Sequence, residues 1–160
     1  MRAGRTLSVV AVCIGLAAAP AMGQASRRPP STPPAAAAPS FVLTGADRLG
    51  RAYDAIFDAD FERASTLVAE ACPPAPPEAC LVLEATRQLW RIQIDPEDRS
   101  RDAAFDTAVT AAITAAEAWT TREPRQAEAW FYLGGAYGAR VQWRVLRQER
   151  LGAARDGREV

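Results

Sequence analysis

The side chains that could do chemistry in this 160-residue chain are cysteines, short acidic clusters and a row of arginines. The sequence holds no histidine, which excludes catalytic triads, Cys-His dyads and metal sites that use imidazole. Its three cysteines are also too few for a four-cysteine zinc site. We therefore expect a protein without catalysis, without a metal site and without a cofactor.

One acidic run has the beginning of a calcium-binding loop. Asp58, Asp60 and Glu62 alternate as the first ligands of such a loop would. Arg63 stands where the loop needs glycine, and Ala69 stands where it needs the final acid. A turn followed by acids at a helix N-terminus explains the run better than a metal site.

Four arginines near the end of the chain fall at spacings of four and three, which places them on one face of a helix: Arg140, Arg144, Arg147 and Arg150. Two interpretations are open, a solvated helix face or a site for an acidic partner. Without Arg2 and Arg5 of the leader described next, 17 basic residues face 19 acidic ones, a net charge of −2. This balance gives no indication of nucleic acid or an anionic membrane as a partner.

The N-terminus has the three parts of a secretory signal peptide. Arg2 and Arg5 are followed by an apolar run over residues 7–19, and Ala21 and Gly23 supply the small residues of a cleavage site. The apolar run is too short to span a bilayer as a retained helix. We expect residues 1–23 to be removed, leaving an exported chain, periplasmic or extracellular, with no stable membrane span.

Residues 24–43 form a predicted linker. The stretch from 26 to 40 contains five prolines and four consecutive alanines and has no apolar periodicity. Such a composition favours a partly extended spacer without core contacts. The helical domain is therefore expected over residues 44–160.

Cys72 and Cys80 enclose a stretch with four prolines, which excludes helix and indicates a stiff loop. An exported chain with two remaining cysteines can form a disulfide between them. The alternative is a pair of buried thiols that act as small hydrophobic side chains. Export and the proline-stiffened loop favour the bridge.

Apolar residues recur at helical spacing in five stretches, and no stretch alternates with period two. The sequence thus predicts an all-α fold without strands. The helices are expected at about 44–57 with Thr44 as N-cap, at 61–71, at 78–94, at 100–121 with Ser100 as N-cap, and at about 125–147. After Gly152 too few residues remain for a second helix of the last pair, which indicates truncation of a longer array.

The stretch from Trp130 to Tyr137 reads W-x2-L-G-x2-Y, the opening of a tetratricopeptide helix pair, and Pro124 stands where the preceding repeat would end. A second match places Ala64, Val68, Ala71 and Pro76 at later positions of one repeat. The chain resembles the tetratricopeptide repeat (TPR) family over these stretches. The resemblance implies a short right-handed α-solenoid, an array of antiparallel helix hairpins.

The resemblance also implies roles for particular residues. A concave groove that binds a partner would be lined by Glu128, Phe131, Gly135, Gly138 and Ala139. Packing between repeats would use Trp130, Leu133, Gly134 and Tyr137, with Gly134 against a helix too close for a Cβ atom.

The expected function is a scaffold outside the cytoplasm that binds a protein or peptide partner through the groove. Basic residues that would grip an acidic chain terminus are lacking at the groove positions, which favours an apolar or extended segment. The alternative is a structural subunit whose helices are buried by self-association or by a larger envelope assembly.

Overall fold

A computed structural model describes residues 42–160, so the predicted leader and residues 24–41 of the predicted linker lie outside the described part. Within that part the chain is all-helical and has no strand, as the sequence predicts. The six helices are α1 (Ala46–Phe57), α2 (Phe61–Ala71), α3 (Pro77–Ile94), α4 (Asp102–Arg122), α5 (Ala127–Leu146) and α6 (Arg150–Asp156). None of the helices in residues 42–160 has the length and apolarity to cross a membrane.

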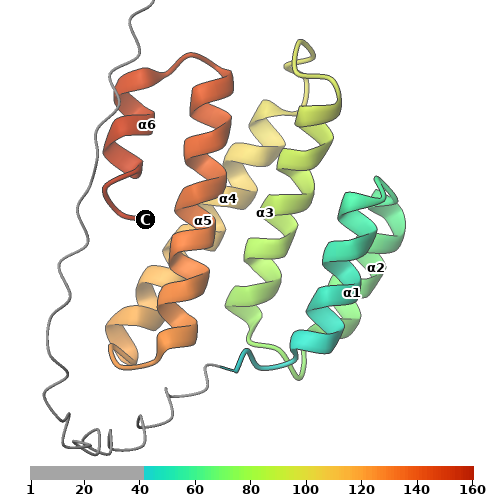
Figure 1. The fold of residues 1–160 in the computed structure, drawn as a ribbon, viewed down its shortest axis with the longest axis vertical. Coiled ribbons are helices and arrows are strands. Elements are labelled where there is room, and N and C mark those ends of the chain that lie inside the picture. Colours follow the sequence, from blue (N-terminus) through green and yellow to red (C-terminus); the bar gives the residue numbers. More distant parts are fainter. Residues whose placement is uncertain (1–41) are drawn as a thin grey trace, which may run out of the picture. The chain divides into compact units, whose positions relative to one another are not determined.

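The helices form pairs whose first members lie side by side. Each helix contacts the next one in the chain, and α3 also contacts both α1 and α5. Figure 1 shows α1, α3 and α5 running in the same direction in one layer, with α2 and α4 behind them. The face that α1, α3 and α5 share is therefore built from residues far apart in the sequence.

The helix starts differ from the expected caps. Gly45, at a left-handed φ of 73°, begins α1, and its missing Cβ lets Ala75 lie against it. The Thr44 hydroxyl instead donates a hydrogen bond to the Glu128 carboxylate. Ser100 does not cap α4, because its backbone N–H and its hydroxyl both donate to the Asp98 carboxylate. Asp60 is the side-chain cap that does form, accepting from the Arg63 N–H of α2.

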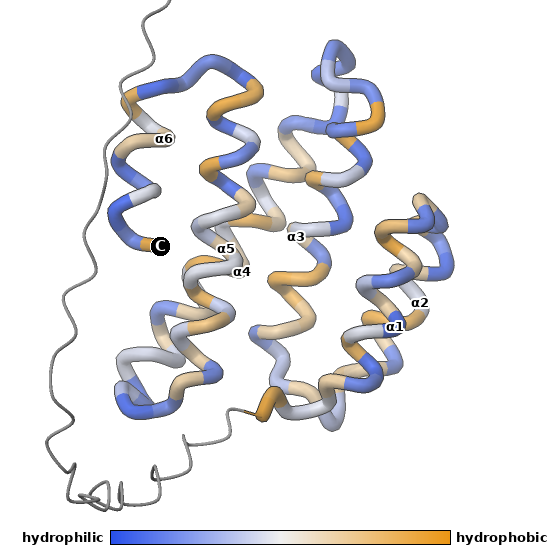
Figure 2. Tube along the Cα trace, in the orientation of Figure 1, coloured by the Kyte–Doolittle hydropathy of each residue, from blue (hydrophilic) through white to orange (hydrophobic). Residues whose placement is uncertain are grey.

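The core combines a few large side chains with many alanines. Phe105, Ile92 and Val109 are fully buried between α3, α4 and α5. Alanines with no exposed surface lie on all five long helices: Ala52, Ala64, Ala71, Ala79, Ala85, Ala112, Ala116, Ala129 and Ala136. Along the tube in Figure 2, hydrophobic residues recur between hydrophilic ones, as expected for helices with one buried face. Small residues at the contacts let the helices approach closely.

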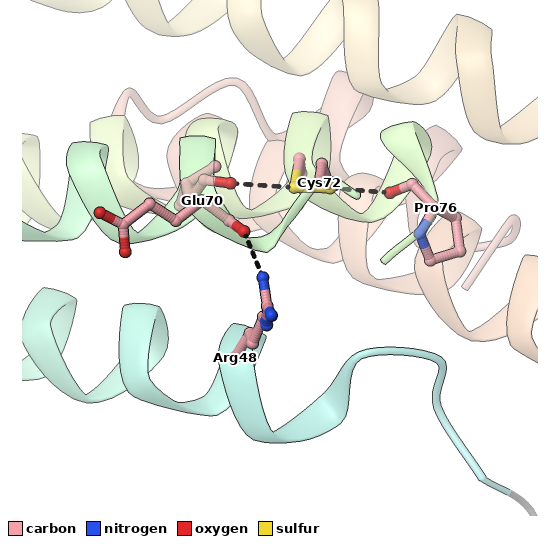
Figure 3. The surroundings of a disulfide bond; sticks show 6 residues. Arg48, Glu70, Cys72 and Pro76 are labelled. Carbon is pink, nitrogen blue, oxygen red and sulfur yellow. Dashed lines mark hydrogen bonds between the residues drawn. A yellow bond between two sulfur atoms is a disulfide. The ribbon is translucent and has the colours of Figure 1, made fainter. Parts of the chain in front are cut away.

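A disulfide joins the end of α2 to the start of α3. Cys72 and Cys80 are bonded, with their Cα atoms 6.4 Å apart (Figure 3), so the predicted bridge is confirmed and the interpretation as two thiols is wrong. Both sulfurs lie against backbone carbonyls, at 3.2 Å from Pro76 O and 3.3 Å from Val68 O. The bridge ties the C-cap residue of α2 to the first turn of α3.

The chain makes one more helix than expected. α5 ends at Leu146, close to its predicted end, and α6 then runs back along α5. Gly152 lies inside α6. The buried Asp156 of α6 accepts two hydrogen bonds from Arg140, at 2.7 and 2.9 Å. The expectation that the last pair lacks its second helix is therefore corrected.

Candidate functional site

A groove of about 310 Å³ lies between α3 and α5, with one side chain of α1 at its edge. Its twelve lining residues come from three helices, and none of them is charged. They are Tyr53 from α1; Val82, Leu83, Thr86, Leu89 and Trp90 from α3; and Phe131, Tyr132, Gly135, Gly138, Ala139 and Gln142 from α5. This size is at the lower end for ligand sites and suits a few side chains of a peptide.

Four of the five residues expected in a groove lie in this one: Phe131, Gly135, Gly138 and Ala139. The fifth, Glu128, does not, because it is only 3% exposed. Its carboxylate accepts hydrogen bonds from the Thr44 backbone N–H at 2.7 Å and from the Thr44 hydroxyl at 3.0 Å. Glu128 therefore anchors the segment before α1 and is not available to a partner.

Two glycines of α5 shape the groove. A Cβ atom at Gly135 would lie 3.5 Å from Val82 Cγ1 of α3, which is ordinary contact, so any larger side chain would crowd the floor. A Cβ atom at Gly138 would have no neighbour within 4 Å. Part of the groove therefore exists because these two glycines have no side chains to fill it.

The face of α5 that packs matches the motif only in part: Leu133 and Tyr137 are buried as expected, whereas Trp130 and Gly134 do not pack as the motif implied. Trp130 is 52% exposed, and its indole N–H donates to Pro124 O at 2.9 Å instead of entering the core. A Cβ atom at Gly134 would have no neighbour within 4 Å, so no helix packs tightly on this residue. The positions of α5 that are buried toward its neighbours are Ala129, Tyr132, Leu133, Ala136 and Tyr137.

Aromatic rings stand at both ends of the groove. At one end Phe57 packs edge-on between Tyr53 and Trp90, with ring centroids 4.8 Å apart on each side. At the other end Phe131 lies edge-on to Tyr132 at 5.2 Å. Gly135 of α5 lies opposite Val82 of α3, because a Cβ atom added to it would come within 3.5 Å of Val82 Cγ1. At 1.5 Å per residue this register places Trp90 about 18 Å along the groove from Phe131.

The polar groups of the groove are neutral. Burial, and then the Glu128 charge, raise the pKa of Tyr132 to about 12, so its hydroxyl keeps its proton at neutral pH. Thr86 donates to Val82 O at 2.8 Å, and Gln142 accepts from Gln93 at 3.2 Å. The site can therefore offer hydrogen bonds but no charge.

The α3 and α1 sides of the groove were not predicted as site residues. Tyr53 and Trp90 lie within the predicted helices 44–57 and 78–94, where apolar residues at helical spacing indicate a buried face. The signal that could have identified these site residues is an aromatic residue at the edge of a helix's apolar stripe, because such a position borders both the core and the solvent. The sequence alone did not distinguish that edge from the centre.

A depression of about 410 Å³ between α1 and α2 is a weaker candidate. It is lined by Arg48, Arg51, Leu67 and Glu70, most of them exposed. Arg48 already donates to Glu70 O at 3.1 Å, as Figure 3 shows. In the described chain, no three His, Cys, Asp or Glu side chains are grouped so that they could hold a metal ion.

The four arginines do not share one helix: Arg140 and Arg144 lie on α5, Arg147 is its C-cap, and Arg150 begins α6. They form neither a solvated face nor a free site for acids. Arg140 binds Asp156, and Arg144 Nε lies 3.2 Å from the same carboxylate without the geometry of a hydrogen bond. Arg147, nearly buried, binds Asp102 of α4 at 2.7 Å. Three of the four arginines are thus paired within the protein.

The bond from Arg147, together with one from the Trp143 indole N–H, holds the pKa of Asp102 below its ordinary value. Arg147 also donates to Pro96 O at 2.6 Å. The end of α5 is thereby tied to the loop before α4. These charges hold the fold together and leave the uncharged groove as the best candidate site.

No family model, curated protein or solved structure matches the chain. The groove itself is therefore the basis for assigning a function.

Proposed function

We propose that this protein is a protein-interaction module that holds an apolar or extended segment of a partner in the groove between α3 and α5. The observation that carries the proposal is the lining, twelve residues that include four aromatic rings and no charge. Aromatic side chains around small residues are typical of sites that take up peptide side chains. A charged ligand would lose its hydration there and find no counter-charge.

We further propose that the helices form a TPR-like array. Three features support this: the W-x2-L-G-x2-Y motif at the start of α5, the side-by-side first helices α1, α3 and α5, and a groove on those first helices. The unequal helix lengths, from 7 to 21 residues, depart from a regular repeat. The groove is accordingly confined to the space between α3 and α5.

We also propose that the module works outside the cytoplasm. The predicted leader over residues 1–23 and the Cys72–Cys80 disulfide support export.

A pair of glycines allows a sharp test of the groove. Gly138 lines the groove and Gly50 lies on α1 outside it, and a Cβ atom at either position would have no neighbour within 4 Å. A photo-crosslinking amino acid at position 138 should capture a discrete partner in the host cell, and the same amino acid at position 50 should not.

The capture should also depend on the groove. Gly138→Leu, which fills it, should lower partner recovery, whereas Gly50→Leu should not. Equal capture from both positions would contradict the proposal. A crosslink only to a second copy of this chain would instead identify a self-associating structural subunit.

A further inference from the structure

We propose that the segment held in the groove is proline-rich and binds in the polyproline II conformation. This inference rests on the proposed function and names the class of partner. It is carried by the hydrogen-bonding groups of the groove, by the spacing of its rings and by its lack of charge.

Three side chains that line the groove carry hydrogen-bond donors that no described residue uses. Among the described residues, none accepts a hydrogen bond from the Trp90 indole N–H, the Tyr53 hydroxyl or the Tyr132 hydroxyl. A polyproline II helix has no internal hydrogen bonds, so its carbonyls are unsatisfied acceptors, and proline carries no N–H that would need an acceptor. The groove and such a ligand complement each other.

A helical ligand would fit these groups less well. The carbonyls of an α-helix are already bonded within the helix, apart from its last turn. The Trp90 and Tyr53 donors would then find no acceptor in the ligand, and a donor that is covered without a partner weakens binding. The donors therefore select against a helix and for a segment with open carbonyls.

The distance between the two aromatic ends matches this conformation. Polyproline II rises about 3.1 Å per residue with three residues per turn, so the interval of about 18 Å spans about six residues, or two turns. One face of the ligand would then meet Tyr53 and Trp90 at one end and Phe131 at the other. Between them, Gly135 and Gly138 leave room for proline rings.

The four tryptophans provide a direct test with built-in controls. The full chain would be labelled with ¹⁵N at the indole nitrogens and titrated with a capped, uncharged dodecapeptide, (Pro-Pro-Ala)₄. We expect the Trp90 indole signal to shift. The Trp130 and Trp143 signals should stay in place, because their N–H groups are bonded to Pro124 O and Asp102.

Two variants test the donors separately, with the affinities measured by calorimetry because Trp90→Phe removes the Trp90 indole signal. Trp90→Phe should weaken binding of the peptide about tenfold, and Tyr53→Phe, at an exposed position, about threefold, the range for one hydrogen bond. Trp130→Phe is the matched control, an exposed tryptophan outside the groove, and should leave the affinity unchanged. Equal affinities for all three variants would overturn the proposal. If Trp90→Phe does not fold, the comparison of Tyr53→Phe with Trp130→Phe still tests it.

A peptide of the same length with every proline replaced by alanine separates this inference from the proposed function. If that peptide shifts the Trp90 signal more than the proline peptide does, the inference is overturned and the groove still binds partners. If neither peptide binds while position 138 crosslinks a partner, the proline-rich ligand is excluded and the proposed function stands. If the crosslink at position 138 also fails, both the proline-rich ligand and the proposed function are contradicted.

Discussion

Thr44 and Glu128 lie 84 residues apart in the sequence, and two hydrogen bonds join them at the start of α5. The buried Glu128 carboxylate accepts both hydrogen bonds from Thr44, which precedes the N-cap residue Gly45 of α1. This contact connects the beginning of the helical domain to its third helix pair, next to the Phe131 end of the groove.

Removing the carboxylate should destabilise the domain. Glu128→Ala leaves the Thr44 N–H and hydroxyl without their acceptor and opens a small cavity, so we expect the free energy of unfolding in urea to fall by about 1–3 kcal/mol. Glu123→Ala, at an exposed position in the loop before α5, should change it by less than about 0.5 kcal/mol. Equal losses would show that the contact contributes nothing.

The Asp102–Arg147 pair should make the protein sensitive to acid. Because the folded-state pKa of Asp102 is lowered, its contribution to stability is complete above the unfolded pKa of about 3.9 and is lost as the pH falls through the lowered value. Asp102→Asn should therefore flatten the loss of stability below about pH 4, measured by urea unfolding. Asp106→Asn, exposed on the same helix, should leave the acid profile unchanged.

Two glycines should respond to alanine in opposite ways. Gly134→Ala places a Cβ atom in open space inside α5 and should raise the melting temperature, because alanine favours helix by about 1 kcal/mol over glycine. Gly45→Ala should lower it, since φ is +73° and the new Cβ would lie 2.8 Å from Ala75 Cβ. Destabilisation by Gly134→Ala would mean that a helix packs on it, as the family motif implied.

Loss of the disulfide should weaken the domain without unfolding it. The bridge closes a short loop, with a sequence separation of 8, and on the chain-entropy model this contributes about 2–3 kcal/mol. In the variant with both Cys72→Ala and Cys80→Ala, the free energy of unfolding measured in urea should be lower by that amount. Reductant should bring the wild type to the same midpoint and leave the double variant unaffected.

The helices could be predicted because each has its own apolar stripe and clear breakers. α2 begins and ends at the predicted residues, and the proline loop before α3 was recognised from composition. The caps were less predictable. Thr44 and Ser100 have the right side chains for capping, but Glu128 and Asp98 provide acceptors that the local pattern did not reveal.

The site could be predicted on one helix only. The motif spacing placed Phe131, Gly135, Gly138 and Ala139 on a common face of α5, and they line the groove. Which residues of α3 and α1 lie opposite depends on the register and rotation of the packed helices, and a single sequence does not encode these in any local pattern. For the same reason Trp130, apolar and at a motif position, was expected inside although the rotation of α5 exposes it.

α6 is the shortest of the six helices and depends on its contacts with α5 to stay folded. At seven residues it is far shorter than the ~12–15 that an isolated helix needs, so its helicity depends on its contacts with α5. Asp156, shared by Arg140 and Arg144, supplies much of that attachment. Local opening should therefore begin here. In native-state hydrogen exchange, the amides of α6 should exchange well before those of α3 and α4, and the opening should leave the groove intact.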